Sequence, residues 1–110
     1  MPEAARDETP WGYFYVPIET ASTMTLVIGT PGRQIVVLDC WFVCSANVNV
    51  KFQTSTGLVD LTGYAYCIQN GGVVLPFSAG GWFATAPGDS LIINLAGGVP
   101  IGGSLTYTLV

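Results

Sequence analysis

Apolar and polar residues alternate in short runs along most of the chain, with turn signals between the runs. Segments 47–54, 89–96 and 104–110 place an apolar side chain at every second residue, which is typical of a half-buried β-strand. No segment shows the apolar repeat of about 3.6 residues expected of a surface helix. The Asn-Gly pair at 70–71 predicts a hairpin turn, and the glycines of 97–103 predict an open loop. The pattern therefore predicts an all-β fold, a single antiparallel β-sandwich of jelly-roll type.

Residues 35–54 differ from these runs because their first half is apolar on both faces. We interpret them as a hairpin that turns at residues 45–46, in which the strand over 35–44 is covered on two sides. A strand that is apolar on both faces needs a second layer of cover, and a second copy of the chain would supply it. The residues assigned to this subunit interface are Val37, Asp39, Trp41 and Val43.

Asp39 is the one acid within this apolar strand. An unpaired carboxylate in a buried position would cost several kcal/mol. We therefore expect a polar partner for it, either Arg33 or Lys51 on the same chain or a donor on the second copy. The alternative is an exposed position on a partly wet face.

Residues 1–17 predict an extended N-terminal arm, which leaves residues 18–110 as the sandwich domain. Aromatic residues gather between Pro10 and Pro17. Proline is disfavoured in helix interiors and central strands, so this stretch is an arm or an edge strand. It either folds back over its own core or anchors on a neighbouring chain, because Trp and Tyr are common interface anchors. The residues assigned to the neighbour interface are Trp11, Tyr13, Phe14 and Tyr15.

Few residues carry charge, which bears on how the surface is used. Half of the 110 residues are hydrophobic and only 9% are charged, against about 25% in typical soluble domains. Either uncharged polar residues keep the surface soluble, or partners cover much of it. Three basic residues and a net charge of −4 argue against nucleic acid binding. No apolar run is long enough to span a bilayer, and the first residues do not resemble a secretory signal.

The sequence contains three cysteines, Cys40, Cys44 and Cys67. Within one strand Cys40 and Cys44 would lie about 13 Å apart, at about 3.3 Å per residue, which is too far for a disulfide. The first interpretation is that all three are small buried hydrophobic residues of a protein made in a reducing compartment. The alternative is a bridge from Cys67 to one of the other two, formed after release from the cell.

Residues for catalysis or metal binding are scarce. The chain has no histidine, which excludes Ser-His and Cys-His pairs, and the cysteine spacing does not match a zinc site. Asp39, Asp60 and Asp89 could supply a carboxylate pair for glycoside hydrolysis, but nothing in the sequence brings two of them together. We therefore expect a protein that is not an enzyme and that binds no cofactor and no metal.

Several sequence blocks carry a resemblance to a known group of proteins. They are SANVNVKFQ at 45–53, DLTG at 60–63, NGGVVLPF at 70–77, GWFAT at 81–85, GDSLIINL at 88–95 and GGSLTY at 102–107. Their order resembles small proteins of tailed bacteriophages and prophages, some of which are similar to capsid decoration (cement) proteins. The resemblance covers residues 16–110 and does not include the aromatic arm or the three cysteines.

The resemblance implies a jelly-roll trimer on the outer surface of a phage head. In this hypothesis the chain is made in the host cytoplasm and becomes part of the virion. There it binds the major capsid protein as a homotrimer and stabilises the head, without nucleic acid or membrane contacts. The aromatic arm would contact capsid protein or the next decoration unit, and Trp82 and Phe83 would belong to the core or to an interface. The alternative is a tail or fibre β-sandwich module that binds a host surface glycan, because exposed aromatic rings stack on sugars.

Overall fold

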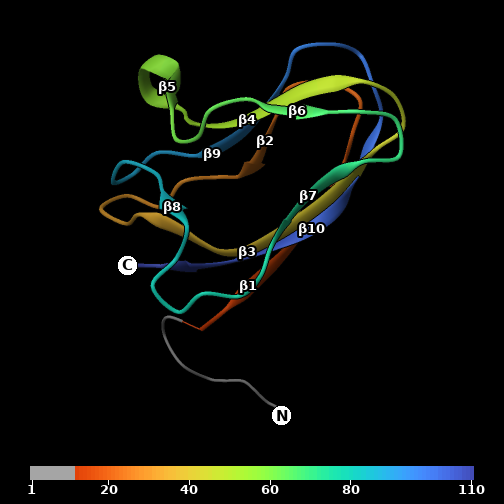
Figure 1. Ribbon diagram of the computed structural model, residues 1–110. Coiled ribbons are helices and arrows are strands. Elements are labelled where there is room, and N and C mark those ends of the chain that lie inside the picture. The colour runs from red at the N-terminus through yellow and green to blue at the C-terminus, as the bar shows by residue number, and fades with distance from the viewer. Residues whose placement is uncertain (1–11) are drawn as a thin grey trace.

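The computed structural model describes residues 12–110 as two antiparallel β-sheets packed face to face (Figure 1). The first sheet contains, in spatial order, β1 (Phe14–Thr20), β10 (Ile101–Leu109), β3 (Ile35–Cys44) and β7 (Gly72–Leu75), and β8 (Phe83–Ala84) also pairs with β3. The second sheet contains β2 (Met24–Val27), β9 (Leu91–Leu95), β4 (Val48–Thr54) and β5 (Val59–Asp60), and β6 (Ala65–Cys67) also pairs with β4. A short 3₁₀ helix, Thr56–Leu58, precedes β5. The prediction of an antiparallel β-sandwich is confirmed.

The connectivity of the strands is that of a jelly roll. Antiparallel pairs are nested along the chain, with β1 against β10, β2 against β9, β3 against β7 and β4 against β6. Successive pairs alternate between the two sheets, and β10 then lies against β3 while β9 lies against β4. This arrangement is what a long antiparallel ribbon gives when it is rolled into two layers.

The core lies between the sheets and is built from the apolar positions that alternate along each strand. Phe42 of β3 and Phe52 of β4 meet across the two layers, with ring centroids 6.5 Å apart in an edge-to-face geometry. Leu91 and Ile93 of β9 and Leu105 of β10 are fully buried in the same core. Burial of each such side chain is worth about 1.5 to 3 kcal/mol, so these alternating positions supply most of the driving force for packing.

A β-bulge in β3 changes which side chains face this core. Asp39 lies opposite Thr106 and Val37 lies opposite Tyr107, so Leu38 is an extra residue on β3. Before the bulge Ile35 and Val37 are fully buried, and after it the even-numbered residues of β3 are buried. An inserted residue reverses the alternation of faces. The assignment of Val37 to a subunit interface is therefore corrected, because its side chain belongs to the core.

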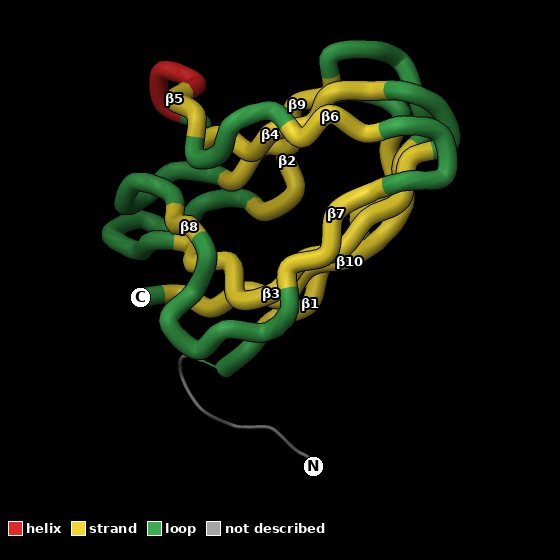
Figure 2. Tube along the Cα trace, viewed as in Figure 1, coloured by secondary structure: helices red, strands yellow, loops and turns green. Residues whose placement is uncertain are grey.

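The two hairpin predictions are wrong. Each of these loops is a corner that joins one sheet to the other. β3 belongs to the first sheet and β4 to the second, and likewise β7 belongs to the first sheet and β6 to the second. The loops at residues 45–47 and 68–71 therefore carry the chain from one layer to the other (Figure 2). Asn70 does have a positive φ of 64°, as an Asn-Gly turn signal suggests. The signal identified a change of direction but not which strands pair around it.

The aromatic stretch is in part an edge strand of the sandwich. β1 begins at Phe14 and pairs with β10 along its whole length, from Phe14 opposite Tyr107 to Thr20 opposite Ile101. Pro17 lies on this outermost strand, where a missing N–H group is tolerated. The predicted boundary at residue 17 is thus corrected, since the sandwich starts at residue 14. The predicted contact residue Trp11, with the residues before it, lies outside the described part of the chain.

Strand β10 also begins earlier than expected. Gly102 and Gly103, predicted to belong to an open loop, pair with Val43 and Phe42 of β3. A Cβ atom on Gly103 would lie 2.0 Å from the carbonyl oxygen of Trp41. The glycine therefore serves a close approach of two backbones rather than a loop.

Candidate interaction surface

The outer side of the first sheet carries an apolar surface that crosses four strands. Val74, Trp41, Ser104 and Pro17 lie directly opposite one another on β7, β3, β10 and β1, and so form one row on one face of the sheet. The neighbouring rows add Val43 and Tyr15. We call the residues Tyr15, Pro17, Trp41, Val43 and Val74 the outer apolar face.

The side chains of the outer apolar face are open to solvent in the single chain. Val74 is 75% exposed and Tyr15 is 69% exposed, while Trp41 and Val43 are each nearly half exposed. Trp41 and Val43, which the sequence predicts at a subunit interface, are thus surface residues of the single chain. Contiguous apolar surface of this kind marks contact sites more often than isolated apolar residues do.

A groove of about 480 Å³ runs along this face beside β7. Ser104 is the residue of β10 that contributes to its lining, and the others belong to β3, to β7 and to the segment just after β7. The residues that line it are Asp39, Cys40, Trp41, Val74, Leu75, Pro76, Phe77 and Ser104. The lining is mainly apolar, with one carboxylate.

Asp39 finds its polar partner within the same sheet. Its Oδ1 atom accepts a hydrogen bond of 3.1 Å from the backbone N–H of Thr106, at the bulge of β3. Its partner is therefore neither of the two basic residues considered from the sequence. Lys51 instead forms an ion pair with Asp60 on the other sheet, with a distance of 3.0 Å between Nζ and Oδ1.

The aromatic residues around β1 divide into two groups. Tyr13 and Tyr15 are both about two-thirds exposed, and the ring of Tyr13 meets Phe77 edge-on at 5.6 Å. Phe14 stacks on Tyr107 of its own sheet at 5.3 Å. Of the predicted contact residues, Tyr13 and Tyr15 are thus available to a neighbouring chain and Phe14 mostly packs on its own domain.

Trp82 and Phe83 lie in different environments. The indole N–H of Trp82 donates a hydrogen bond of 2.8 Å to the carbonyl of Pro76, and its ring is 46% exposed. Phe83 turns inward and meets Phe52, with ring centroids 5.0 Å apart. Of the two alternatives left open by the sequence, Phe83 belongs to the core and Trp82 to the surface.

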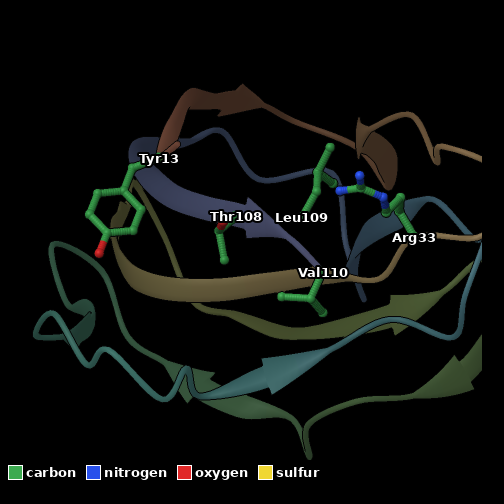
Figure 3. A pocket seen from close by; sticks show the side chains of 5 residues that line it. All are labelled: Tyr13, Arg33, Thr108, Leu109 and Val110. Atoms are coloured by element: carbon green, nitrogen blue, oxygen red, sulfur yellow. The ribbon is translucent and has the colours of Figure 1, made fainter. Parts of the chain in front are cut away.

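A second hollow lies at the end of β10, close to the start of the described chain. It has a volume of about 530 Å³ and is lined by Tyr13, Arg33, Thr108, Leu109 and Val110. Figure 3 shows Tyr13 and Arg33 at opposite ends of it. Its walls offer apolar surface, the ring of Tyr13 and the guanidinium group of Arg33.

The outer side of the second sheet is polar, and its side chains bind one another. Asp60 accepts hydrogen bonds from Gln53 at 2.9 Å and from Lys51 at 3.2 Å, and these bonds lower the pKa of its carboxyl group. The bond to Asp60 in turn raises the pKa of Lys51. Lys51 also lies 4.5 Å above the ring of Tyr64. Tyr66, at 80% exposure, lies opposite Asn49 on the same sheet.

The three aspartates of residues 12–110 are each engaged separately. Asp39 binds β10, Asp60 binds Lys51 and Gln53, and Asp89 binds two threonines. Within residues 12–110, no three His, Cys, Asp or Glu side chains come together as metal ligands would. Among those same residues no helix has the length and apolar content of a membrane span.

Sequence reasoning did not find two parts of this surface. Val74 and Pro17 belong to it because β7 lies beside β3 and β1 lies beside β10, and no local pattern contains that information. Pairing between strands far apart in sequence creates the rows. The apolar character of Trp41 and Val43 was the part of the signal that lay within a single strand.

No protein-family model matches this sequence, and a comparison with curated proteins finds no match. One solved structure is similar in shape, a virus-like particle of extra small virus from the giant freshwater prawn Macrobrachium rosenbergii, determined by cryo-electron microscopy. The match covers 99% of this chain and 86% of that chain, with a TM-score of 0.41 and 11% identity. A likeness this weak supports no conclusion about function.

Proposed function

We propose that this chain is a non-enzymatic structural protein of a virion, a decoration protein that binds the outer surface of a phage capsid as a trimer and stabilises the head. The outer apolar face is the observation that carries the proposal. The order of sequence blocks, which resembles that of phage decoration proteins, is the reason to propose a phage head as the particle. The major capsid protein is the partner in this proposal, and neither nucleic acid nor a membrane is involved.

The outer apolar face supports assembly because the fold does not use it internally. Trp41, Val43 and Val74 point away from the core, and the core is complete without them. A soluble protein with few charged residues gains little from leaving such a row in water. Contact with two further copies removes it from solvent, which is the arrangement proposed for the trimer.

Stabilisation of the capsid by this protein follows from mass action. A protein that binds the assembled shell and not its separated subunits stabilises the shell by its binding free energy. Three linked copies add avidity to weak single contacts. The proposed capsid contacts are Tyr15, at the β1 edge of the outer apolar face, and the nearby Tyr13, together with Trp11.

The trimer is tested by the mass of the purified protein in multi-angle light scattering. We expect a mass near three times 11.6 kDa. Val74→Lys places a charge at the β7 edge of the outer apolar face, beside Trp41, and is expected to give a folded monomer. Tyr66→Lys is the matched control, because Tyr66 is equally exposed but lies on the other sheet. A monomeric wild-type protein, or an unaffected Val74→Lys trimer, would overturn this part of the proposal.

Capsid attachment is tested with purified heads in a sedimentation assay. Deletion of residues 1–12 leaves β1 intact and is expected to preserve the trimer but weaken attachment. Heads that carry the protein are expected to survive higher temperature than bare heads. Attachment that is independent of both the deletion and Tyr15→Ala would remove the aromatic stretch from the mechanism.

One observation favours the alternative of a tail or fibre module that binds a host glycan. Tyr66 is highly exposed and lies opposite Asn49, and an aromatic ring beside an amide suits stacking on a sugar with hydrogen bonds at its edge. Against it, Gln53, Asp60 and Asn94 nearby bind one another. Immuno-electron microscopy of intact particles separates head from tail, and loss of cell binding in Tyr66→Ala would favour the glycan module.

A further inference from the structure

The two corners that join the sheets lie side by side at one end of the sandwich (Figure 2). Cys44 ends β3 just before the first corner, and its N–H donates to the carbonyl of Gly71 in the second corner at 2.7 Å. The N–H of Asn70 donates to the carbonyl of Cys44 at 2.8 Å. A further bond of 3.0 Å runs from the N–H of Gln69 to the side chain of Asn47. The corners are therefore held together by backbone contacts on both sides of Cys44.

Cys67 ends β6 just before the second corner and faces Cys44 across the core. Cys44 is fully buried and Cys67 is 7% exposed, and both belong to the core between the sheets. The thiol of Cys67 donates to the carbonyl of Ala65, with 3.6 Å between sulfur and oxygen. Cys67 is also among the groups that raise the pKa of the Cys44 thiol, after burial itself, and both thiols are free and buried at this end of the core. These thiols come from opposite sheets.

Cys40 has a different environment, although it is also buried. It lies four residues before Cys44 on β3, opposite Leu105 and Leu75. In the extended strand this separation is about 13 Å, at about 3.3 Å per residue. Cys40 is therefore out of reach of Cys44 and offers an internal control.

We propose that Cys44 and Cys67 form a covalent modification site, at which a small disulfide such as oxidised glutathione converts the two thiols into a bond between the sheets. One cysteine thiolate attacks oxidised glutathione, forms a mixed disulfide and releases one glutathione. The other thiolate then attacks the mixed disulfide and releases the second glutathione. In total, two protein thiols are oxidised, one glutathione disulfide is reduced to two thiols, and the two protons pass to the released glutathiones.

The bond forms slowly because the thiols are buried. Burial, together with the hydrogen bond to Cys67, raises the pKa of Cys44 to about 11, so little of the reactive thiolate is present at neutral pH. The reaction also requires local opening of the corners, which exposes the thiols. The reduced pair is thus compatible with synthesis in a reducing cytoplasm, and oxidation follows prolonged exposure to an oxidising medium.

The bond would link the sheets at the end where the chain passes between them. It closes a loop that contains all of β4, β5 and β6, and this restricts the unfolded chain more than the folded one. We expect the melting temperature to rise by about 10 °C on oxidation. Reduction should reverse the rise.

The test compares the full-length protein incubated for a day with oxidised glutathione or with a reductant. We expect free thiols, counted after denaturation, to fall from three to one, with a mass loss of about 2 Da for the two hydrogens removed. Peptide mapping should recover Cys44 joined to Cys67 within one chain. Three persisting thiols, a bridge that includes Cys40, or a bridge between chains would each overturn the proposal.

Alanine variants separate the pair from the third cysteine. Cys40→Ala should still lose both remaining thiols and gain the same rise in melting temperature. Cys44→Ala and Cys67→Ala should form no intramolecular bridge and show no rise. If a variant does not fold, the peptide map of the wild-type protein still decides the pairing.

Discussion

The hydroxyl group of Thr54 donates a hydrogen bond of 2.6 Å to the carboxylate of Asp89 and so ties the end of β4 to the loop before β9. Asp89 also accepts from the hydroxyl of Thr56 at 2.7 Å and from its N–H at 3.0 Å. The oxygen of Thr54 accepts in turn from the N–H of Ala86. Asp89 thus connects two segments more than thirty residues apart.

These bonds make the stability of the sandwich dependent on pH. The hydrogen bonds from Thr54 and then Thr56 lower the pKa of Asp89 below its value of about 3.9 in an unfolded chain. Its stabilising effect is therefore complete above about pH 4 and is lost as the pH falls through the lower folded pKa. Asp89→Asn should lower the melting temperature at pH 7, and the difference from wild type should disappear near pH 2.

Asp60→Asn is the control for this pH series. Asp60 also has a lowered pKa, but it is exposed on the surface of the second sheet, so screening by water and salt should make its effect smaller. Thermal denaturation of both variants between pH 2 and pH 7 separates them. A difference between wild type and Asp89→Asn that is constant with pH would contradict the role given to the Asp89 charge.

A second prediction concerns the bulge of β3. Asp39→Ala leaves the N–H of Thr106 without its acceptor, and a partly buried donor left unpaired costs about 1 to 3 kcal/mol. Asp39→Asn keeps an oxygen in the same place and should recover most of that loss. Urea denaturation gives the free energies of unfolding, and equal losses in the two variants would show that the charge, rather than the hydrogen bond, matters.

A third prediction distinguishes two adjacent glycines of β10. Gly103→Ala places a methyl group against the backbone of Trp41 and should cost about 1 to 3 kcal/mol through overpacking. For Gly102→Ala the nearest neighbour is the carbonyl oxygen of Ile18 at 3.9 Å, an ordinary contact, so its stability should change by less than about 1 kcal/mol. Similar free energies of unfolding for the two variants would contradict the close approach of β10 and β3.

A fourth prediction compares neighbours on opposite faces of β3. Phe42 is 1% exposed in the core, whereas Val43 is 46% exposed on the outer apolar face. Phe42→Ala should destabilise the fold by about 3 to 5 kcal/mol, and Val43→Ala by less than about 1 kcal/mol. Chemical denaturation of the dissociated protein checks both. A large loss in Val43→Ala would mean that this face supports the single domain itself.

Local alternation was enough to predict most strands and the sandwich, because a strand that buries one face must alternate wherever it lies. It failed inside β3, where Val37 was assigned to the outer face. The extra residue Leu38 is defined only by the pairing of β3 with β10, more than sixty residues later. A pattern within ten residues cannot contain that information.

The same limit explains the hairpins. The Asn-Gly pair at residues 70–71 correctly marks a reversal of direction, but a corner between layers and a hairpin within a layer use similar local turns. Whether the turn is a corner or a hairpin depends on strand pairing, because β7 pairs with β3 and β6 pairs with β4. The outer apolar face is assembled from strands that pair at long range. For this reason the sequence pattern identified Trp41 and Val43 but not Val74 and Pro17 as parts of it.

The pairing of β1 with β10 has a consequence for how the protein is made. Phe14 lies opposite Tyr107, so the first sheet lacks its second strand until almost the whole chain has left the ribosome. At a synthesis rate of about 5 to 20 residues per second, β1 and β3 are made several seconds before β10. During that time the edges that pair with β10 are uncovered. Contacts so distant in sequence also close slowly. Speed of translation and access to chaperones should therefore influence the yield of folded protein.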